Sequence, residues 1–331
     1  MSPTAGVDWK ALHGDFFAGC TTLVTGGAGF IGSHLAEALA RLGASVAVLD
    51  DLSGGSRENL LSSSHVEFVE GSILDRDLLA RCTRGRRFVF HQAALGSVPR
   101  SIEQPRLYND VNIVGTLNVL EAAREMKVAR VLFAASSSAY GENPVPWVET
   151  MPPGPHSPYA ATKLAGEGLL QAYASSYGLD TVSLRYFNIF GPRQNANSAY
   201  AAVIAAFAKA LLAGQRPVIY GTGEQSRDFT FVANAVQANL LAARHSRPLG
   251  GEVINVGCGA RISVNELAGA MGAALGRGEL VPIYQPPRAG DLMHSFADLK
   301  RAADRLGYRP IVEFRPGLEQ TLAWYRAALS R

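Results

Sequence analysis

The segment from Thr25 to Gly32 reads TGGAGFIG and constrains the fold of this chain more than any other feature. It follows a short, β-rich apolar run, 21–24, and precedes 33–39, whose apolar residues have helical spacing. Gly26, Gly29 and Gly32 permit a tight turn and let backbone N–H groups approach a pyrophosphate at a helix N-terminus. The pattern therefore predicts a strand, a glycine-rich turn and a helix that together bind a dinucleotide.

A second apolar run, 45–49, ends in two carboxylates, Asp50 and Asp51. They lie about 20 residues after the glycines, where a carboxylate accepts a hydrogen bond from the adenosine ribose 2′-OH. A 2′-phosphate would be repelled there, so the sequence predicts NAD rather than NADP. A strand–turn–helix unit without a ligand is the alternative, and the position of the carboxylates argues against it.

Tyr159 and Lys163 stand four positions apart in the segment YAATK, which places both on one face of a helix. A tyrosine hydroxyl has a pKa near ~10 and is a poor base at neutral pH. The lysine charge, added to that of an oxidised nicotinamide, should lower the tyrosine pKa. Ser136, at the end of the predicted buried strand 131–135, can hydrogen-bond the substrate oxygen whose proton Tyr159 takes. These residues predict redox chemistry on a hydroxyl group.

The motifs of this chain resemble those of the extended short-chain dehydrogenases/reductases over residues 20–326. The resemblance rests on TGGAGFIG, HQAA at 91–94, NIVGT at 112–116, SSSAYG at 136–141, YAATK at 159–163, LRYFN at 184–188 and RDF at 227–229. Within that family the chain is most similar to the nucleotide-sugar 4-epimerases related to UDP-galactose 4-epimerase. The resemblance implies a dinucleotide-binding fold, bound NAD and a homodimer.

Positions within these motifs also imply the contacts with NAD. They are Gly26, Gly29, Phe30, Ile31, Gly32, Asp50, Asp51, Ser72, Ile73, Gln92, Ala93, Ala94, Asn112, Tyr159, Lys163 and Phe187. One position departs from the family, whose members often have an aspartate that contacts the adenine amine where this chain has Ser72. Ser72 must make this contact, or NAD is held less tightly.

Three segments narrow the substrate that the resemblance implies. The runs LGSVPRS at 95–101 and SAYAAVI at 198–204 are similar to those of epimerases that act on UDP-N-acetylhexosamines or their uronic acids. The third segment, 288–295, ends in Ser295, where epimerases restricted to non-acetylated sugars have a tyrosine. A small residue leaves room for a 2-acetamido group, whereas a ring would exclude it.

The resemblance likewise implies a set of substrate contacts. They are Gly96, Ser97, Ser136, Ser138, Tyr159, Asn188, Ala202, Val203, Tyr220, Arg227, Arg288, Asp291 and Ser295. Arg227 and Arg288 would hold the diphosphate, because guanidinium groups match phosphate oxygens geometrically. Tyr220 follows the strand-like run 217–219 and would flank the uracil.

The implied reaction is inversion at carbon 4 of UDP-GlcNAc, which gives UDP-GalNAc through a 4-keto intermediate. Related dehydratases and decarboxylases need a carboxylate where this chain has Ser137 and Ser138, so the sequence disfavours both activities. Three alternatives remain, namely 4-epimerisation of UDP-GlcNAc uronic acid, 4-epimerisation of UDP-glucose or UDP-galactose, and a non-catalytic NAD-binding sensor. The sensor is disfavoured because Ser136, Tyr159 and Lys163 are all present.

The 331 residues are enough for one large core and a smaller lobe. Alternating strand-like and helical segments predict an α/β fold, a doubly wound parallel Rossmann sheet with a smaller α/β lobe that caps the substrate. We expect an N-terminal extension at 1–18, the NAD-binding domain at 19–190 and a mainly substrate-binding lobe at 191–331. Segments near 227–257 should return to the first domain, with a helix at 228–244 and a strand at 253–256.

Composition excludes several classes of partner. A net charge of +3 is too small to indicate nucleic-acid binding. The longest apolar stretch, 201–213, is interrupted by Lys209 and is too short to span a bilayer, so no membrane partner is expected. The first twenty residues do not read as a signal peptide. Cys20, Cys82 and Cys258 lack paired spacing and the histidines lack ligand spacing, which predicts a cytoplasmic protein without a metal site.

Overall fold

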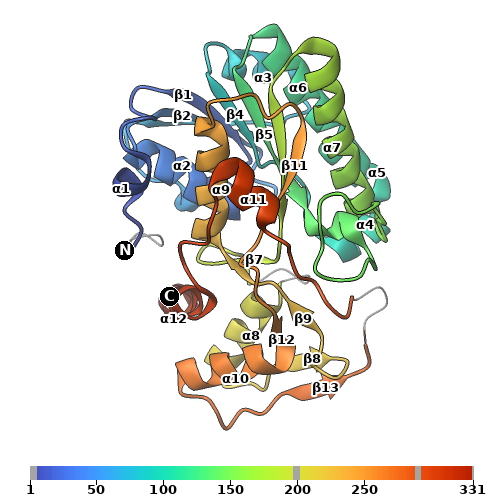
Figure 1. The fold of residues 1–331 in the computed structure, drawn as a ribbon. Helices are drawn as coiled ribbons and strands as arrows, with labels where there is room; N and C mark the ends of the chain where they lie inside the picture. Colours follow the sequence, from blue (N-terminus) through green and yellow to red (C-terminus); the bar gives the residue numbers. More distant parts are fainter. Residues whose placement is uncertain (1–5, 197–201, 288–291, 330–331) are drawn as a thin grey trace.

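A seven-stranded parallel sheet forms the centre of the computed structural model, which describes residues 6–196, 202–287 and 292–329 (Figure 1). The strand order is β11-β6-β5-β4-β1-β2-β3, and every neighbouring pair is parallel. The strands are β1 (Thr21–Thr25), β2 (Ser45–Asp50), β3 (Val66–Glu70), β4 (Phe88–His91), β5 (Arg130–Ser136), β6 (Thr181–Tyr186) and β11 (Glu252–Val256). The predicted α/β Rossmann fold is confirmed.

Helices cover both faces of the sheet, and each face has its own apolar core. On one face lie α2 (Phe30–Arg41), α9 (Val232–Arg244) and α11 (Lys300–Leu306), and on the other lie α3 (Arg76–Thr83), α6 (Gly115–Glu125) and α7 (Pro158–Tyr177). Successive side chains of β1 alternate between the two, since Leu23 belongs to the α6–α7 core and Val24 to the α2–α9 core. Burial on both faces explains the continuous apolar runs 46–49 in β2 and 131–135 in β5.

The N-terminal segment packs on the α2 face of the sheet. Its helix α1 (Trp9–His13) is capped by Asp8, whose side chain accepts a hydrogen bond from the backbone N–H of Ala11. Trp9 and Phe17 are buried in the α2–α9 core. His13 shares a 2.8 Å hydrogen bond with Gln237 of α9, so the segment is fixed to the sheet by polar as well as apolar contacts.

A run of short helices joins β4 to β5 on the α7 side. It contains α4 (Val98–Glu103), α5 (Pro105–Asn109), the π-helical turn η2 (Asp110–Val114) and then α6. Two further short helices, η1 (Arg57–Asn59) and η3 (Ser137–Tyr140), follow β2 and β5. Both therefore begin near the carboxyl ends of strands.

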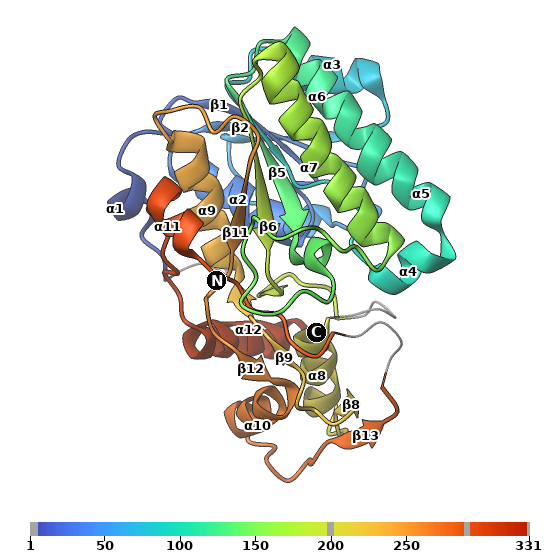
Figure 2. The same cartoon turned by 45° about the vertical axis from the view of Figure 1, so that its right-hand side comes forward.

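The smaller lobe lies beyond the carboxyl ends of the sheet strands (Figure 2). It contains the helices α8 (Val203–Leu212), α10 (Val264–Leu275) and α12 (Phe314–Leu329). Three strand pairs accompany them, β8 (Val218–Tyr220) with β13 (Ile283–Gln285), β9 (Ser226–Arg227) with β12 (Ile262–Ser263), and β7 (Ile189–Phe190) with β10 (Thr230–Phe231). Between these elements the chain returns to the sheet through α9 and β11, and β11 pairs with β6.

The described residues also bear on membrane spans, metal sites and disulfides. In these ranges no helix has both the length and the apolar character needed to cross a membrane. The same ranges hold no group of three or more His, Cys, Asp or Glu side chains that could ligate a metal. Cys20, Cys82 and Cys258 are free thiols.

Candidate active site

A cavity of about 1140 Å³ lies at the carboxyl ends of the sheet strands and extends to the smaller lobe. Its wall includes the glycine turn after β1, the residues that follow β2 to β6, and residues of the lobe. A second cavity of about 260 Å³ shares Asn188, Ile189, Ala202 and Arg227 with the first. Ligands of open α/β sheets bind at this edge, where strand order reverses.

The glycine turn has the shape of a dinucleotide cradle. Gly26 has a φ of +67°, and a Cβ atom there would lie 2.6 Å from the Cα of Ala93. A Cβ on Gly32 would overlap the carbonyl oxygen of Gly26. Helix α2 begins at Phe30 with no side-chain cap at Gly29, and Phe30, Ile31 and Gly32 of its first turn line the cavity. A pyrophosphate fits this backbone, because its oxygens would accept from the N–H groups of that turn.

The two carboxylates after β2 have different environments. Asp50 is buried and accepts from the backbone N–H groups of Ala28 and Leu52 at 2.9 and 2.8 Å, which fixes the glycine turn. Burial raises its pKa above the ordinary value for an aspartate. Asp51 is exposed and accepts from the N–H and hydroxyl of Ser53. Both line the cavity, and each carboxylate keeps free acceptor sites for a ribose hydroxyl.

Most of the other residues predicted to contact NAD also line the larger cavity. They are Gly26, Gly29, Phe30, Ile31, Gly32, Ser72, Ile73, Gln92, Ala93, Ala94, Tyr159 and Lys163. Gln92 is held by the hydroxyl of Tyr186, which donates to its side-chain oxygen at 3.2 Å. The hydroxyl of Ser72 accepts from the N–H of Leu74, so this serine also shapes its own turn.

Two predicted cofactor residues lie outside the cavity wall. Asn112 is buried and bonds both backbone groups of Leu95 and the hydroxyl of Thr162, so it joins a cavity loop to α7. Phe187 is fully buried against the rings of Tyr140 and Trp147. In the structure Asn112 is held by these hydrogen bonds and Phe187 by these ring contacts, and their predicted contacts with the cofactor stay predictions.

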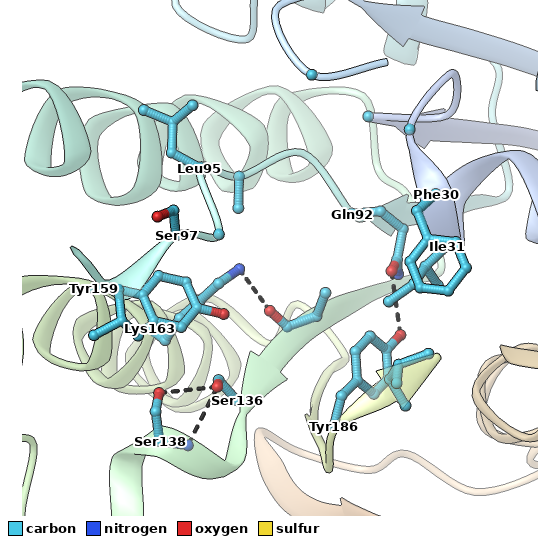
Figure 3. Close-up of a pocket in the computed structure, with 18 of the residues that line it drawn as sticks. Phe30, Ile31, Gln92, Leu95, Ser97, Ser136, Ser138, Tyr159, Lys163 and Tyr186 are labelled. Atoms are coloured by element: carbon cyan, nitrogen blue, oxygen red, sulfur yellow. Dashed lines mark hydrogen bonds between the residues drawn. The ribbon is translucent and has the colours of Figure 1, made fainter. Parts of the chain in front are cut away.

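The three predicted catalytic residues converge on one part of the wall (Figure 3). Ser136 ends β5, and its hydroxyl accepts from the backbone N–H and the hydroxyl of Ser138 at 3.2 and 2.9 Å. Tyr159 lies in the first turn of α7, which is capped by the hydroxyl of Ser157. Lys163 follows one turn later, and its ammonium group donates to the carbonyl oxygen of Ala134 at 2.7 Å.

Burial has the largest influence on the pKa of Tyr159. Burial raises it, and only a hydrogen bond with Ser136 opposes the rise. Burial also lowers the pKa of Lys163 to about 7, against the opposing influence of Glu167. The lowering of the Tyr159 pKa by Lys163 together with an oxidised nicotinamide stays a prediction. The helical spacing of the two residues was predicted correctly, but their common burial was not visible in it.

The predicted substrate residues fall in both cavities. Ser295 is 4% exposed and accepts from the side-chain amide of Asn188 at 3.4 Å, and both line the larger cavity. The larger cavity also includes Gly96, Ser97, Ser136, Ser138, Tyr159, Ala202 and Arg227, and the smaller one includes Val203 and Tyr220. Arg288 and Asp291 lie outside the described residues.

Several cavity residues were missed by the sequence analysis. Tyr108 is buried and accepts from the backbone N–H of Ser97 at 3.1 Å, which holds the loop beside Tyr159. Gly55 packs against the glycine turn, where a Cβ atom would lie 2.7 Å from the carbonyl carbon of Ala28. The Gly54-Gly55 pair soon after Asp51 was the one available signal, whereas a tyrosine eleven residues from its partner gives none.

Comparison with known proteins places this site in a family. Residues 22–257 match the model of the "NAD dependent epimerase/dehydratase family". The UDP-glucose 4-epimerase of Mycolicibacterium smegmatis is 42% identical over 311 residues, which cover 92% of this chain and 98% of the relative.

Two solved structures agree closely with the fold. The UDP-N-acetylglucosamine 4-epimerase from Methanobrevibacter ruminantium M1, in complex with UDP-N-acetylmuramic acid, has a TM-score of 0.90 at 40% identity and covers 94% of this chain and 99% of its own. The Thermus thermophilus UDP-glucose 4-epimerase, in complex with NAD, has a TM-score of 0.84 at 40% identity and covers 93% and 99%.

The chain therefore belongs to the NAD dependent epimerase/dehydratase family, within the extended short-chain dehydrogenases/reductases. It is an NAD-dependent nucleotide-sugar 4-epimerase. The predicted enzyme class and cofactor are thereby confirmed, and the non-catalytic sensor is set aside.

Proposed function

We propose that this NAD-dependent UDP-sugar 4-epimerase interconverts UDP-N-acetylglucosamine and UDP-N-acetylgalactosamine. The observation that carries the proposal is Ser295, a small side chain in the cavity wall beside Asn188. Gly96 supports it from another part of the wall, because nothing lies within 4 Å of the point where its Cβ would stand. Small residues at both positions leave volume for a 2-acetamido group. The Methanobrevibacter neighbour, named a UDP-N-acetylglucosamine 4-epimerase, has the same fold at 40% identity.

The residues of the cradle would hold the cofactor. The first turn of α2 would bind the pyrophosphate, and Asp50 or Asp51 would accept from the adenosine ribose. Lys163 would bind the nicotinamide ribose beside Tyr159. When bound, NAD supplies a hydride acceptor for carbon 4 of the sugar and a positive charge next to the phenol.

The chain's own residues would handle the proton and the nucleotide. Tyr159 would take the proton of the 4-hydroxyl and return it, and Ser136 would hydrogen-bond the same oxygen. Because burial raises the pKa of Tyr159, the phenolate needs positive charge near it before it can act as a base. Arg227 and Asn188, which line both cavities, would hold the diphosphate, and Tyr220 would place the uracil in the smaller one.

UDP-glucose and UDP-galactose form the second candidate substrate pair. The Mycolicibacterium relative and the Thermus neighbour, both named UDP-glucose 4-epimerases, favour it. The uronic acid of UDP-GlcNAc is a third candidate, for which a basic side chain in the wall, Arg100 or His156, could pair with the carboxylate.

Proton NMR of the purified protein with each UDP-sugar distinguishes these candidates. We expect conversion of UDP-GlcNAc to UDP-GalNAc with a higher kcat/KM than for UDP-glucose. A higher kcat/KM for UDP-glucose, or turnover of the uronic acid alone, would contradict the proposal and select the corresponding alternative. Each reaction is run with and without added NAD, because Ser72 replaces the aspartate common in the family.

We also propose that the protein is a homodimer, paired through the helical segment 98–117. Five large apolar side chains of this segment are exposed, Val98, Ile102, Leu107, Val114 and Leu117, with Ile102 at 64%. Light scattering after size exclusion should give twice the chain mass of 35.2 kDa. Ile102→Asp should shift the mass toward the monomer, and Val281→Asp, at a similarly exposed site in the other lobe, should not.

A further inference from the structure

Asp228 is a fully buried carboxylate to which neither the resemblance nor the proposed reaction gives a role. It directly follows Arg227 and is 0% exposed. Burial raises its pKa to about 6, and the hydrogen bonds that it accepts oppose the rise. Burying a carboxylate costs free energy unless hydrogen bonds satisfy its oxygens, so the partners of Asp228 show which segments it holds together.

The carboxylate of Asp228 connects two segments that are far apart in the sequence. It accepts from the backbone N–H groups of Cys258 and Gly259, at 2.8 and 3.0 Å, in the loop after β11. It also accepts from the N–H of Ala297 at 3.4 Å and from the hydroxyl of Thr230 at 3.4 Å. The loop after β11 and the segment that contains Ser295 thereby meet at one side chain.

Gly257 shows how closely the loop surrounds this carboxylate. A Cβ atom at Gly257 would lie 2.6 Å from Oδ2 of Asp228 and 3.1 Å from Cβ of Ala297. The φ of Gly257 is outside the left-handed region, so an alanine is acceptable to the backbone and only the contact forbids it. Gly257 therefore leaves the space that the Asp228 carboxylate occupies. We call Asp228 with the N–H groups that it accepts from, those of Cys258, Gly259 and Ala297, the Asp228 clasp.

The Asp228 clasp is next in sequence to Arg227 and two residues from Ser295, and both of these residues line the larger cavity. Ser226 accepts from the N–H of Ser295 at 3.0 Å and donates its own N–H to Met293, so β9 is paired with this segment on one side of Arg227. Asp228 attaches to the same segment on the other side, at Ala297. Arg227 is thus held between two attachment points, and on the facing segment Ser295 belongs to the first of them and precedes the second, Ala297, by two residues.

We infer that Asp228 is a positioning residue for the UDP-sugar, because it fixes Arg227 and Ser295 in the cavity wall. The inference rests on the proposed function for the roles of these two residues. The Asp228 side chain itself does not line either cavity, so it acts through its neighbours. A loosened Asp228 clasp should weaken binding of the nucleotide sugar while NAD, held by the other side of the cavity, stays bound.

The test compares Asp228→Asn with the same substitution at Asp180, a carboxylate at the opposite end of the sheet that is ion-paired with Arg130. Asp180 also accepts from two backbone N–H groups, those of Leu249 and Gly250, at 2.7 and 3.0 Å, but it precedes β6 and lies outside both cavities. For Asp228→Asn we expect KM for the UDP-sugar and Kd for UDP to rise at least about tenfold, with kcat changed less than about threefold. For Asp180→Asn we expect a lower melting temperature with KM and Kd unchanged. NAD content is measured in both variants.

A second variant keeps the test decisive where Asp228→Asn does not fold. Gly257→Ala retains the carboxylate but displaces it, so it should raise KM and the Kd for UDP in the same way. Gly269→Ala is its control, because nothing lies within 4 Å of the added Cβ. Unchanged UDP affinity in a folded Asp228→Asn or Gly257→Ala protein would overturn the inference, as would an equal loss in Asp180→Asn.

Measuring the affinity for UDP distinguishes a failure of this inference from a failure of the proposed function. If the wild-type protein binds UDP but does not convert UDP-GlcNAc, the proposed substrate fails and calorimetry with UDP still decides the role of Asp228. If the wild-type protein does not bind UDP, the diphosphate role of Arg227 is wrong and the inference falls with it.

Discussion

The ammonium nitrogen of Lys163 donates to the carbonyl oxygen of Ala134, 2.7 Å away. Ala134 lies two residues before Ser136 on β5, so this bond ties Lys163 of α7 to the strand that carries the predicted catalytic serine. Lys163 is only 3% exposed, and burial lowers its pKa to about 7. Burial therefore disfavours the charged form of this lysine.

Replacing Lys163 with methionine should stabilise the NAD-free protein below pH 7, by about 1–3 kcal/mol. The unfolded lysine has a pKa near ~10.4, so between about pH 7 and 10.4 the unfolded chain binds more protons and wild-type stability rises with pH. The gain of the variant should then shrink across that window. Urea unfolding at several pH values measures it.

The exposed Lys209 of α8 provides the control for this pH dependence. Lys209→Met should change stability little and equally at every pH. A gain for Lys163→Met that stays constant or grows from pH 7 to 10 would show that the lysine is not the group responsible.

Tyr159→Phe should lower turnover about 10²–10⁴-fold, the usual contribution of a positioned proton-transfer group. NAD binding should persist, because the glycine turn and the first turn of α2 are untouched. Tyr177→Phe, at the exposed last residue of α7, removes a hydroxyl from the same helix and should keep full activity. NMR turnover and cofactor absorbance are measured together, and near-normal turnover of Tyr159→Phe would refute its role.

The fold could be predicted because its signals are local. Runs of alternating or continuous apolar residues mark strands, and the predicted strand at 253–256 corresponds to β11 at Glu252–Val256. The helix expected from 228 begins only at Val232, because residues 226–231 contribute the short strands β9 and β10. Such two-residue strands form only because they pair with segments distant in the sequence, and a local sequence pattern does not predict that pairing.

The site could be predicted only where the backbone conformation itself requires a particular residue type, as in the glycine turn. Gly26 and Gly32 follow from the steric needs of the turn, and the structure shows the contacts that require them. The roles of Asn112 and Asp228 depend on partners 17 to 69 residues away, which sequence spacing does not reveal. The raised pKa of Tyr159 likewise comes from burial, a property of the assembled fold.

Gly26→Ala should weaken NAD binding at least about tenfold, because the new Cβ would meet the backbone of Ala93 in the cradle. Gly85→Ala is a matched control, since Gly85 also has a positive φ, +71°, but nothing lies within 4 Å of its Cβ position. The control should lose about 1 kcal/mol of stability and no NAD affinity. Equal NAD affinity in the two variants, measured by calorimetry, would contradict the assigned cradle.

Ser295→Tyr should reduce or reverse the proposed preference for acetylated sugars. A tyrosine ring at this point of the wall would occupy the space assigned to the 2-acetamido group, so kcat/KM for UDP-GlcNAc should fall at least about tenfold relative to that for UDP-glucose. Ser175→Tyr, on the exposed face of α7, adds the same ring outside the cavity and should leave the ratio unchanged. Because the readout is a ratio of two substrates on one protein, a general loss of stability cancels. An unchanged ratio in Ser295→Tyr would show that another part of the wall receives the acetamido group.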